Sequence, residues 1–146
     1  EQIGDYVYEI LEIEPQNVES FMKKRDFCGI NVTIPYKETV IPYLDYIDDS
    51  AKKIGAVNTV VNRDGKLYGY NTDYYGMKAL IERIGIDFAD KKVLVLGTGG
   101  TSKTACVVAS DLGAAEILIV SRKKEKNTIK ITNRIKIPIF FPCCDW

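Results

Sequence analysis

The feature that most constrains the fold lies between residues 91 and 120. A nearly continuous apolar run, Lys91–Leu96, leads into Gly-Thr-Gly-Gly at 97–100, and a second apolar run, Glu116–Val120, follows a stretch of small residues. An apolar strand without alternation is typical of a parallel strand covered on both faces. Parallel strands need a crossover, which a helix over residues 101–112 would supply. The segment therefore predicts a βαβ unit within an α/β fold.

The glycine turn of this unit predicts a dinucleotide site. Glycines between a buried strand and a helix let the backbone approach a pyrophosphate, which rests on N–H groups at the helix N-terminus. The first two glycines of that pattern are present, whereas Ser102 takes the place of the third. The residues expected to hold the phosphates are Gly97, Thr98, Gly99, Gly100 and Thr101. The alternative is a glycine-rich loop that binds nothing.

The end of the second strand predicts which dinucleotide binds. NAD sites place Asp or Glu about 20 residues past the glycines, at the ribose 2′-OH. This chain has Ser121, Arg122 and Lys123 there instead. A guanidinium binds a 2′-phosphate bidentately, and a carboxylate would repel it. We therefore expect NADP as the cofactor, with a solvated basic turn as the alternative.

Composition narrows the possible chemistry. The 146 residues carry 20 basic and 20 acidic side chains and no histidine. Balanced charge argues against a nucleic-acid partner, and no apolar run approaches the ~18 residues of a membrane span. Without histidine, proton transfer falls to Lys, Asp, Glu, Tyr, Cys or water. Cys28, Cys106, Cys143 and Cys144 lack metal-binding spacing, so we expect no metal and free thiols in the cytoplasm.

The first half of the chain predicts a further group of strands and helices. We expect strands over residues 6–13, 29–34, 56–62 and 66–70, and helices over 15–24, 36–47 and 73–84. Pro15 suits the first turn of a helix, and Pro35 closes a strand because proline cannot donate to a ladder. The Asp64-Gly65 pair is typical of a hairpin turn, and Asp73 stands where a helix N-cap is expected.

Polar side chains gather at the ends of these strands. Lys37 follows the strand that Pro35 closes, and Asn58 and Asp73 stand at the ends of two later strands. Amides, hydroxyls and a carboxylate in such places can hold a polyhydroxylated substrate. The alternatives are a surface lysine at 37 and turn and cap chemistry at 58 and 73.

Four motifs occur in an informative order: Asn-Val-Thr-x-Pro-x-Lys at 31–37, Gly-Ala-Val-Asn-Thr at 55–59, Asn-Thr-Asp-x-x-Gly at 71–76, and Gly-x-Gly-Gly at 97–100. Over roughly residues 6–124 this order resembles the shikimate dehydrogenase family. The resemblance implies a three-layer α/β substrate domain facing a Rossmann-type NADP domain. It also implies reduction of the C3 ketone of 3-dehydroshikimate to shikimate by NADPH, in aromatic amino-acid biosynthesis.

The resemblance further implies the roles of single residues. Lys37 matches the family's catalytic lysine, and Asp73 matches its carboxylate partner and a substrate contact. Substrate contacts are also expected at Asn31, Thr33 and Asn58. At the second strand's end, the arginine at 122 matches that of the family's Asn-Arg-Thr segment, with serine and lysine as its neighbours.

These matches divide the chain into three parts. We expect residues 1–72 to form an incomplete substrate domain, 73–124 the first βαβ unit of an incomplete NADP domain, and 125–146 an atypical tail, out of frame or disordered. The family's initial strand, its Ser-x-Ser motif and its later Rossmann strands are missing, so we expect a truncated chain with little activity. A quinate or aminoshikimate dehydrogenase, or a non-catalytic nucleotide-binding remnant, stays open, as does the oligomeric state.

Overall fold

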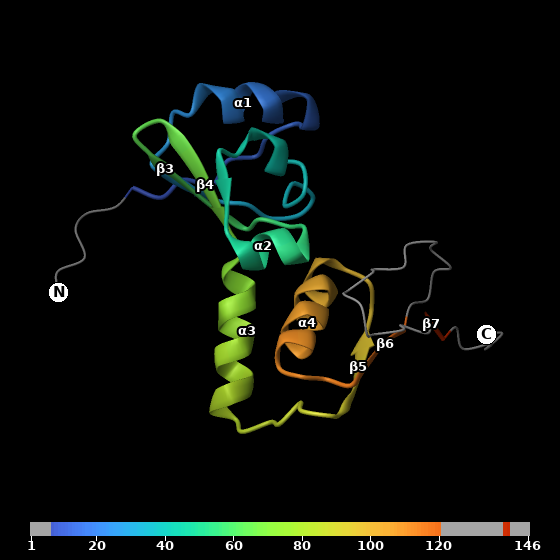
Figure 1. Cartoon of the computed structure of the whole chain (residues 1–146). Coiled ribbons are helices and arrows are strands. Elements are labelled where there is room, and N and C mark those ends of the chain that lie inside the picture. Colours follow the sequence, from blue (N-terminus) through green and yellow to red (C-terminus); the bar gives the residue numbers. More distant parts are fainter. Residues whose placement is uncertain (1–6, 121–138, 141–146) are drawn as a thin grey trace.

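The computed structural model describes residues 7–120 and 139–140 (Figure 1). The elements run in the order η1 (Pro15–Asn17), α1 (Val18–Lys24), β1 (Gly29–Asn31), η2 (Ile41–Tyr43), β2 (Tyr46–Ile47), α2 (Asp49–Ile54), β3 (Thr59–Arg63), β4 (Lys66–Tyr70), α3 (Thr72–Arg83), β5 (Lys92–Leu96), α4 (Gly100–Asp111), β6 (Glu116–Val120) and β7 (Ile139–Phe140). The strands form two sheets; α2 lies below the first sheet, and α4 lies between α3 and the second sheet (Figure 1).

The first sheet has the strand order β1-β3-β4-β2. The β3–β4 hairpin turns at Asp64 and Gly65, which both have positive φ, as a type I′ turn requires, and this confirms the predicted hairpin. β1 is antiparallel to β3, and β2 is parallel to β4. The core against α1 includes the fully buried Met22, Val60 and Leu67. A Cβ at Gly69 would meet the end of the Leu44 side chain and the methyl groups of Val57, so a larger residue there would require these side chains to shift.

The second sheet has the strand order β5-β6-β7, with β5 and β6 parallel and α4 as the crossover between them. Val93 and Val95 of β5 pack toward the buried Ile117 and Cys106. On the other face, Leu94 and Leu96 are 57% and 77% exposed. Among the described residues, α4 packs on one face of β5 only, and the other face is left partly uncovered.

Contacts among α2, α3 and α4 join the two sheets. Some of these contacts are apolar and others are polar. Ile54, Tyr74 and Val108 share one buried cluster from α2, α3 and α4. Asp111 at the end of α4 accepts a 2.7 Å hydrogen bond from the Tyr74 hydroxyl and pairs with the Lys53 ammonium at 3.1 Å. These contacts hold α3 beside α4 and beneath α2 (Figure 1).

Several predicted elements are wrong. Residues 7–13 form no strand, because their backbone finds no partner strand among the described residues. The predicted helix over 36–47 is replaced by turns, η2 and β2, since three β-branched residues at 39–41 precede Pro42. The sequence reading missed α2, which Asp48 caps by accepting from the Ser50 N–H at 2.9 Å. Strand β1 ends at Asn31, three residues earlier than predicted.

The predicted tail over 125–146 falls outside the described residues, apart from β7, which pairs with β6 in parallel. Within residues 7–120 and 139–140, no helix is long and apolar enough to cross a membrane.

Candidate active site

Lys37 and Asp73 meet although 36 positions separate them in the sequence. The Lys37 Nζ lies 2.9 Å from the Asp73 Oδ2, and the two side chains are 26% and 43% exposed. The Lys37 C=O accepts a 2.8 Å hydrogen bond from the Val57 N–H, which fixes the lysine backbone beside the start of β3. The pair is thus anchored on both sides and still reachable by a small molecule.

Asp73 is not the N-cap of α3, so that expectation is wrong. The N-cap is Asn71, with extended backbone, and its own side chain makes no capping bond. The Thr72 N–H is instead satisfied by the side chain of Asn58, whose Oδ1 accepts at 2.9 Å. Asp73 lies in the first turn, where a carboxylate is favoured by the helix dipole, and its side chain is free to hold Lys37.

Asn58 is buried and uses both polar atoms of its side chain within the protein. Its Nδ2 donates to the Thr72 hydroxyl at 3.0 Å, and its Oδ1 also accepts from the Thr59 hydroxyl at 3.0 Å. Nearby, the Asn71 Nδ2 donates to the Ala56 C=O at 2.9 Å, and the Asn71 Oδ1 has no hydrogen-bond partner in the described chain. These two asparagines fix the start of α3 and therefore the position of Asp73.

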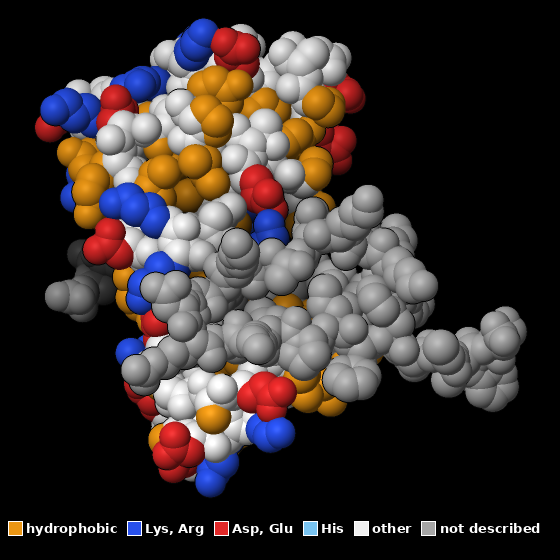
Figure 2. Space-filling model, turned by 45° about the vertical axis from the view of Figure 1, so that its right-hand side comes forward, with side chains coloured by type: hydrophobic (Ala, Val, Ile, Leu, Met, Phe, Trp, Pro, Cys, Tyr) orange, Lys and Arg blue, Asp and Glu red, His pale blue; other side chains and the backbone are white. Residues whose placement is uncertain are grey.

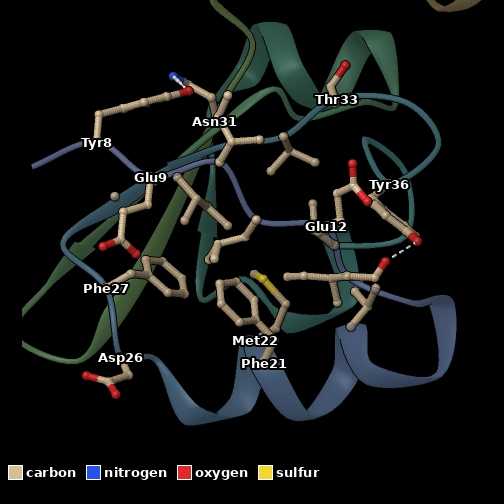
Figure 3. Close-up of a pocket in the computed structure, with 18 of the residues that line it drawn as sticks. Tyr8, Glu9, Glu12, Phe21, Met22, Asp26, Phe27, Asn31, Thr33 and Tyr36 are labelled. Atoms are coloured by element: carbon tan, nitrogen blue, oxygen red, sulfur yellow. Dashed lines mark hydrogen bonds between the residues drawn. The ribbon is translucent and has the colours of Figure 1, made fainter.

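Asn31 and Thr33 line a cavity beside β1. Both are exposed and line a cavity of about 870 Å³ to which Lys37, Asn58 and Asp73 do not contribute. The Asn31 Nδ2 donates to the Tyr8 hydroxyl at 3.3 Å (Figure 3). The structure thus brings Lys37 and Asp73 together but does not gather all predicted substrate residues in one cavity.

The glycine turn has the geometry of an open helix N-terminus. Gly97 has a φ of 113°, which favours glycine, and its N–H donates to the Val120 C=O at 2.8 Å. Gly99 caps α4, and a Cβ on Gly99 or Gly100 would meet no atom within 4 Å. Ser102 is buried and its hydroxyl donates to the Gly99 C=O at 2.5 Å. As far as the described residues are concerned, the space beside the turn is therefore open for a ligand to approach the backbone.

An ion pair that was not predicted from the sequence links the segment of Lys37 to the helix that follows the glycine turn. Lys103, in the first turn of α4, pairs with Glu38, the neighbour of Lys37. A cation near a helix N-terminus is disfavoured by the helix dipole, and the Glu38 carboxylate offsets that charge. Thr98 and Thr101 are exposed at the same turn. The predicted Ser121, Arg122 and Lys123 lie outside the described residues.

No group of three or more possible metal ligands occurs within the described ranges. The arrangement offers instead a positioned ammonium, its carboxylate partner and an open glycine turn.

The fold and site define an α/β protein with a lysine–carboxylate pair between two sheets. Residues 1–60 match the family described as "Shikimate dehydrogenase substrate binding domain". The shikimate dehydrogenase (NADP(+)) of Clostridium beijerinckii is 43% identical over 91% of this chain and 50% of its own length. The resemblance to the shikimate dehydrogenase family is therefore confirmed.

Solved structures agree with this result. Shikimate dehydrogenase 1 from Peptoclostridium difficile matches with a TM-score of 0.75 and 37% identity, over 90% of this chain and 48% of that chain. A shikimate 5-dehydrogenase from Thermus thermophilus, in complex with NADP(H) and shikimate, matches with a TM-score of 0.66 and 32% identity, over 75% of this chain and 42% of that chain. The chain spans about half the length of the curated relatives that it matches.

Proposed function

We propose that this chain carries the substrate-binding part and the phosphate-binding turn of an enzyme that reduces 3-dehydroshikimate to shikimate with NADPH. The observation that carries the proposal is the Lys37–Asp73 ion pair at 2.9 Å. Residues 1–72 would supply the substrate domain and 73–124 the first βαβ unit of a Rossmann-type NADP domain. The relatives named as NADP-dependent shikimate dehydrogenases support this assignment.

The chemistry needs a proton or a cation where the ketone oxygen becomes an alkoxide. NADPH, when bound, supplies the hydride. Lys37 carries an ammonium that can donate a hydrogen bond to the ketone oxygen and then transfer a proton. Asp73 orients this ammonium, because an ion pair fixes one of its three N–H directions. Asn58 acts through the backbone, by holding the first turn of α3 in place.

The glycine turn fits the phosphates of NADP. Open space at Gly99 and Gly100 allows close approach, and the N-terminus of α4 offers N–H groups with a favourable dipole. The sequence adds Arg122 as the residue for the 2′-phosphate.

The test uses a full-length chimera, in which this chain replaces the matching half of the Clostridium beijerinckii relative. We expect NADPH oxidation with 3-dehydroshikimate at a kcat in the ordinary range of about 1–10³ s⁻¹. Assays of the reverse reaction with shikimate, quinate and aminoshikimate separate the three substrate assignments. A folded chimera that binds NADP but reduces no 3-dehydroshikimate would contradict the proposal.

A further inference from the structure

α4 is the helix through which the two halves of the chain are packed together. Its Cys106 packs with Ile117 of the second sheet. Its Val107 and Val108 pack with residues of α2 and α3. Because the glycine turn leads directly into α4, the placement of this helix against the first half of the chain sets where the turn lies relative to Lys37.

The face of α4 toward the first half of the chain has a charged residue at each end. Lys103, Val107 and Asp111 are spaced by four positions and therefore share one face of the helix. At the end of α4, the Asp111 carboxylate pairs with the Lys53 ammonium of α2 at 3.1 Å. At the start of α4, the Lys103 ammonium pairs with the Glu38 carboxylate. The helix is thus held at both ends, and the pair at its start is the one beside the glycine turn.

The carboxylate of this second pair belongs to the segment that carries Lys37. Glu38 is the next residue, within the turns that span residues 34–40. The Val40 and Ile41 N–H groups donate to carbonyls of the same segment at 3.1 and 3.2 Å, which makes the turns a connected unit. The ion pair therefore joins the helix behind the glycine turn to the unit that carries the proposed proton donor.

The pair acts by contact between two side chains. On the face shown in Figure 2, basic and acidic side chains of the described residues are interspersed, so charge of one sign does not gather at this place. The Lys103 side chain is 29% exposed and that of Glu38 is 63% exposed. Ion pairs that water reaches contribute little to folding stability. The position of this pair matters more, because small displacements of reacting groups lower a rate steeply.

We propose that Lys103 and Glu38 are positioning residues of the reduction. Their ion pair holds the start of α4 against the turns that carry Lys37, and so sets the place of the cofactor on the glycine turn relative to the Lys37 ammonium. Lys103 acts through α4, and Glu38 acts through the backbone of residues 34–40. The inference rests on the proposed function, because the pair has a rate to set only if hydride transfer occurs.

Amide hydrogen exchange in the 146-residue chain tests the contact without any activity. Lys103→Ala should speed exchange at the Val40 and Ile41 amides by about two- to fivefold, the range of one exposed ion pair. Lys103→Arg keeps the charge and should keep the slow exchange. Lys53→Ala removes the ion pair at the other end of α4 and should leave these two amides unchanged. Unchanged exchange in Lys103→Ala would overturn the inference.

Kinetics of the full-length chimera test the consequence for the reaction. Lys103→Ala and Glu38→Gln should each lower kcat by about two- to fivefold, since the loss is bounded by the free energy of the pair. The KM for 3-dehydroshikimate should change less. Because the two residues act as one pair, the double variant should lose no more than either single variant. Lys103→Arg should keep most of the kcat, and Lys53→Ala should keep all of it.

The kinetic outcomes separate this inference from its alternatives. A higher KM for NADPH in Lys103→Ala, with parental kcat in Glu38→Gln, would make Lys103 a phosphate ligand and overturn the inference. Losses that multiply in the double variant would also overturn it, because they would show two independent roles. A folded but inactive parent chimera would refute the proposed function together with this inference. An active parent with unaffected variants would refute the inference alone.

Discussion

Asn58 connects β4, the residue after β1 and the start of α3 by its own hydrogen bonds. Its backbone N–H donates to the Tyr70 C=O at 3.0 Å, and its C=O accepts from the Val32 N–H at 2.8 Å. Its side chain caps α3 through the Thr72 N–H. Replacing such a buried amide lowers the free energy of unfolding, because its partners lose their hydrogen bonds.

We therefore predict that Asn58→Ala lowers the free energy of unfolding by ~1–3 kcal/mol, the cost of leaving buried polar groups unpaired. Urea denaturation followed by circular dichroism measures this change. Asn17→Ala is the matched control, since Asn17 is exposed and its side chain makes no capping bond. Equal stability of the two variants would show that the Asn58 bonds contribute nothing.

Arg122 carries the predicted cofactor preference. In the full-length chimera, Arg122→Asp should reduce the preference for NADPH over NADH by about 1–3 kcal/mol, through a lost charge-assisted hydrogen bond and added repulsion. Steady-state kcat/KM values with both cofactors give the measurement. An unchanged cofactor ratio would refute the role of Arg122.

Among the elements, α3 and α4 are tied by Tyr74 and Asp111. The hydrogen bond to Asp111, with burial, raises the pKa of Tyr74 to about 12 from 10.0. A raised pKa means that the folded state holds the phenol proton more tightly than the unfolded state. The resulting stabilisation is complete below pH 10 and is lost as the pH rises from 10 toward 12.

We predict that the stability difference between the wild-type chain and Tyr74→Phe is constant below pH 10 and shrinks above it. Urea unfolding at a series of pH values measures both proteins, with Tyr8→Phe as the exposed control. A difference that stays constant through pH 11 would contradict the assigned hydrogen bond.

The elements that depend on local chemistry could be predicted from the sequence. The hairpin at Asp64-Gly65 and the helix that follows Pro15 need only turn and cap residues. β2 could not be predicted, because two residues become a strand only by pairing with β4. Residues 7–13 alternate like a strand, but a strand also needs a neighbour, which a local pattern does not supply.

For the site, the sequence could supply candidates but not their geometry. The prediction that Lys37 and Asp73 act as a pair rested on the order of four motifs. Nothing local to either residue requires a partner 36 positions away. That Asn31 and Thr33 line the cavity beside residues 7–14 could not be predicted, because it depends on how residues 7–14 lie against β1.

At the scale of the whole molecule, the chain covers about half of its relatives' length. Leu94 and Leu96 leave one face of β5 exposed, and β1 has an unpaired edge in the described residues. We predict that the 146-residue chain alone binds NADP weakly at best and shows no measurable reduction of 3-dehydroshikimate. NADPH absorbance with the purified chain measures this, and turnover near about 1–10³ s⁻¹ would refute it.

The central claim is that Lys37, held by Asp73, delivers the proton of a dehydrogenase reaction. The most direct measurement compares kcat for the full-length chimera and its Lys37→Ala variant, with Lys78→Ala as a control that removes a lysine making no ion pair in the described part of the chain. We predict a loss of roughly 10²–10⁴-fold in kcat for Lys37→Ala, with a smaller change in KM and no loss for the control. A Lys37→Ala chimera with the kcat of its parent would contradict the account.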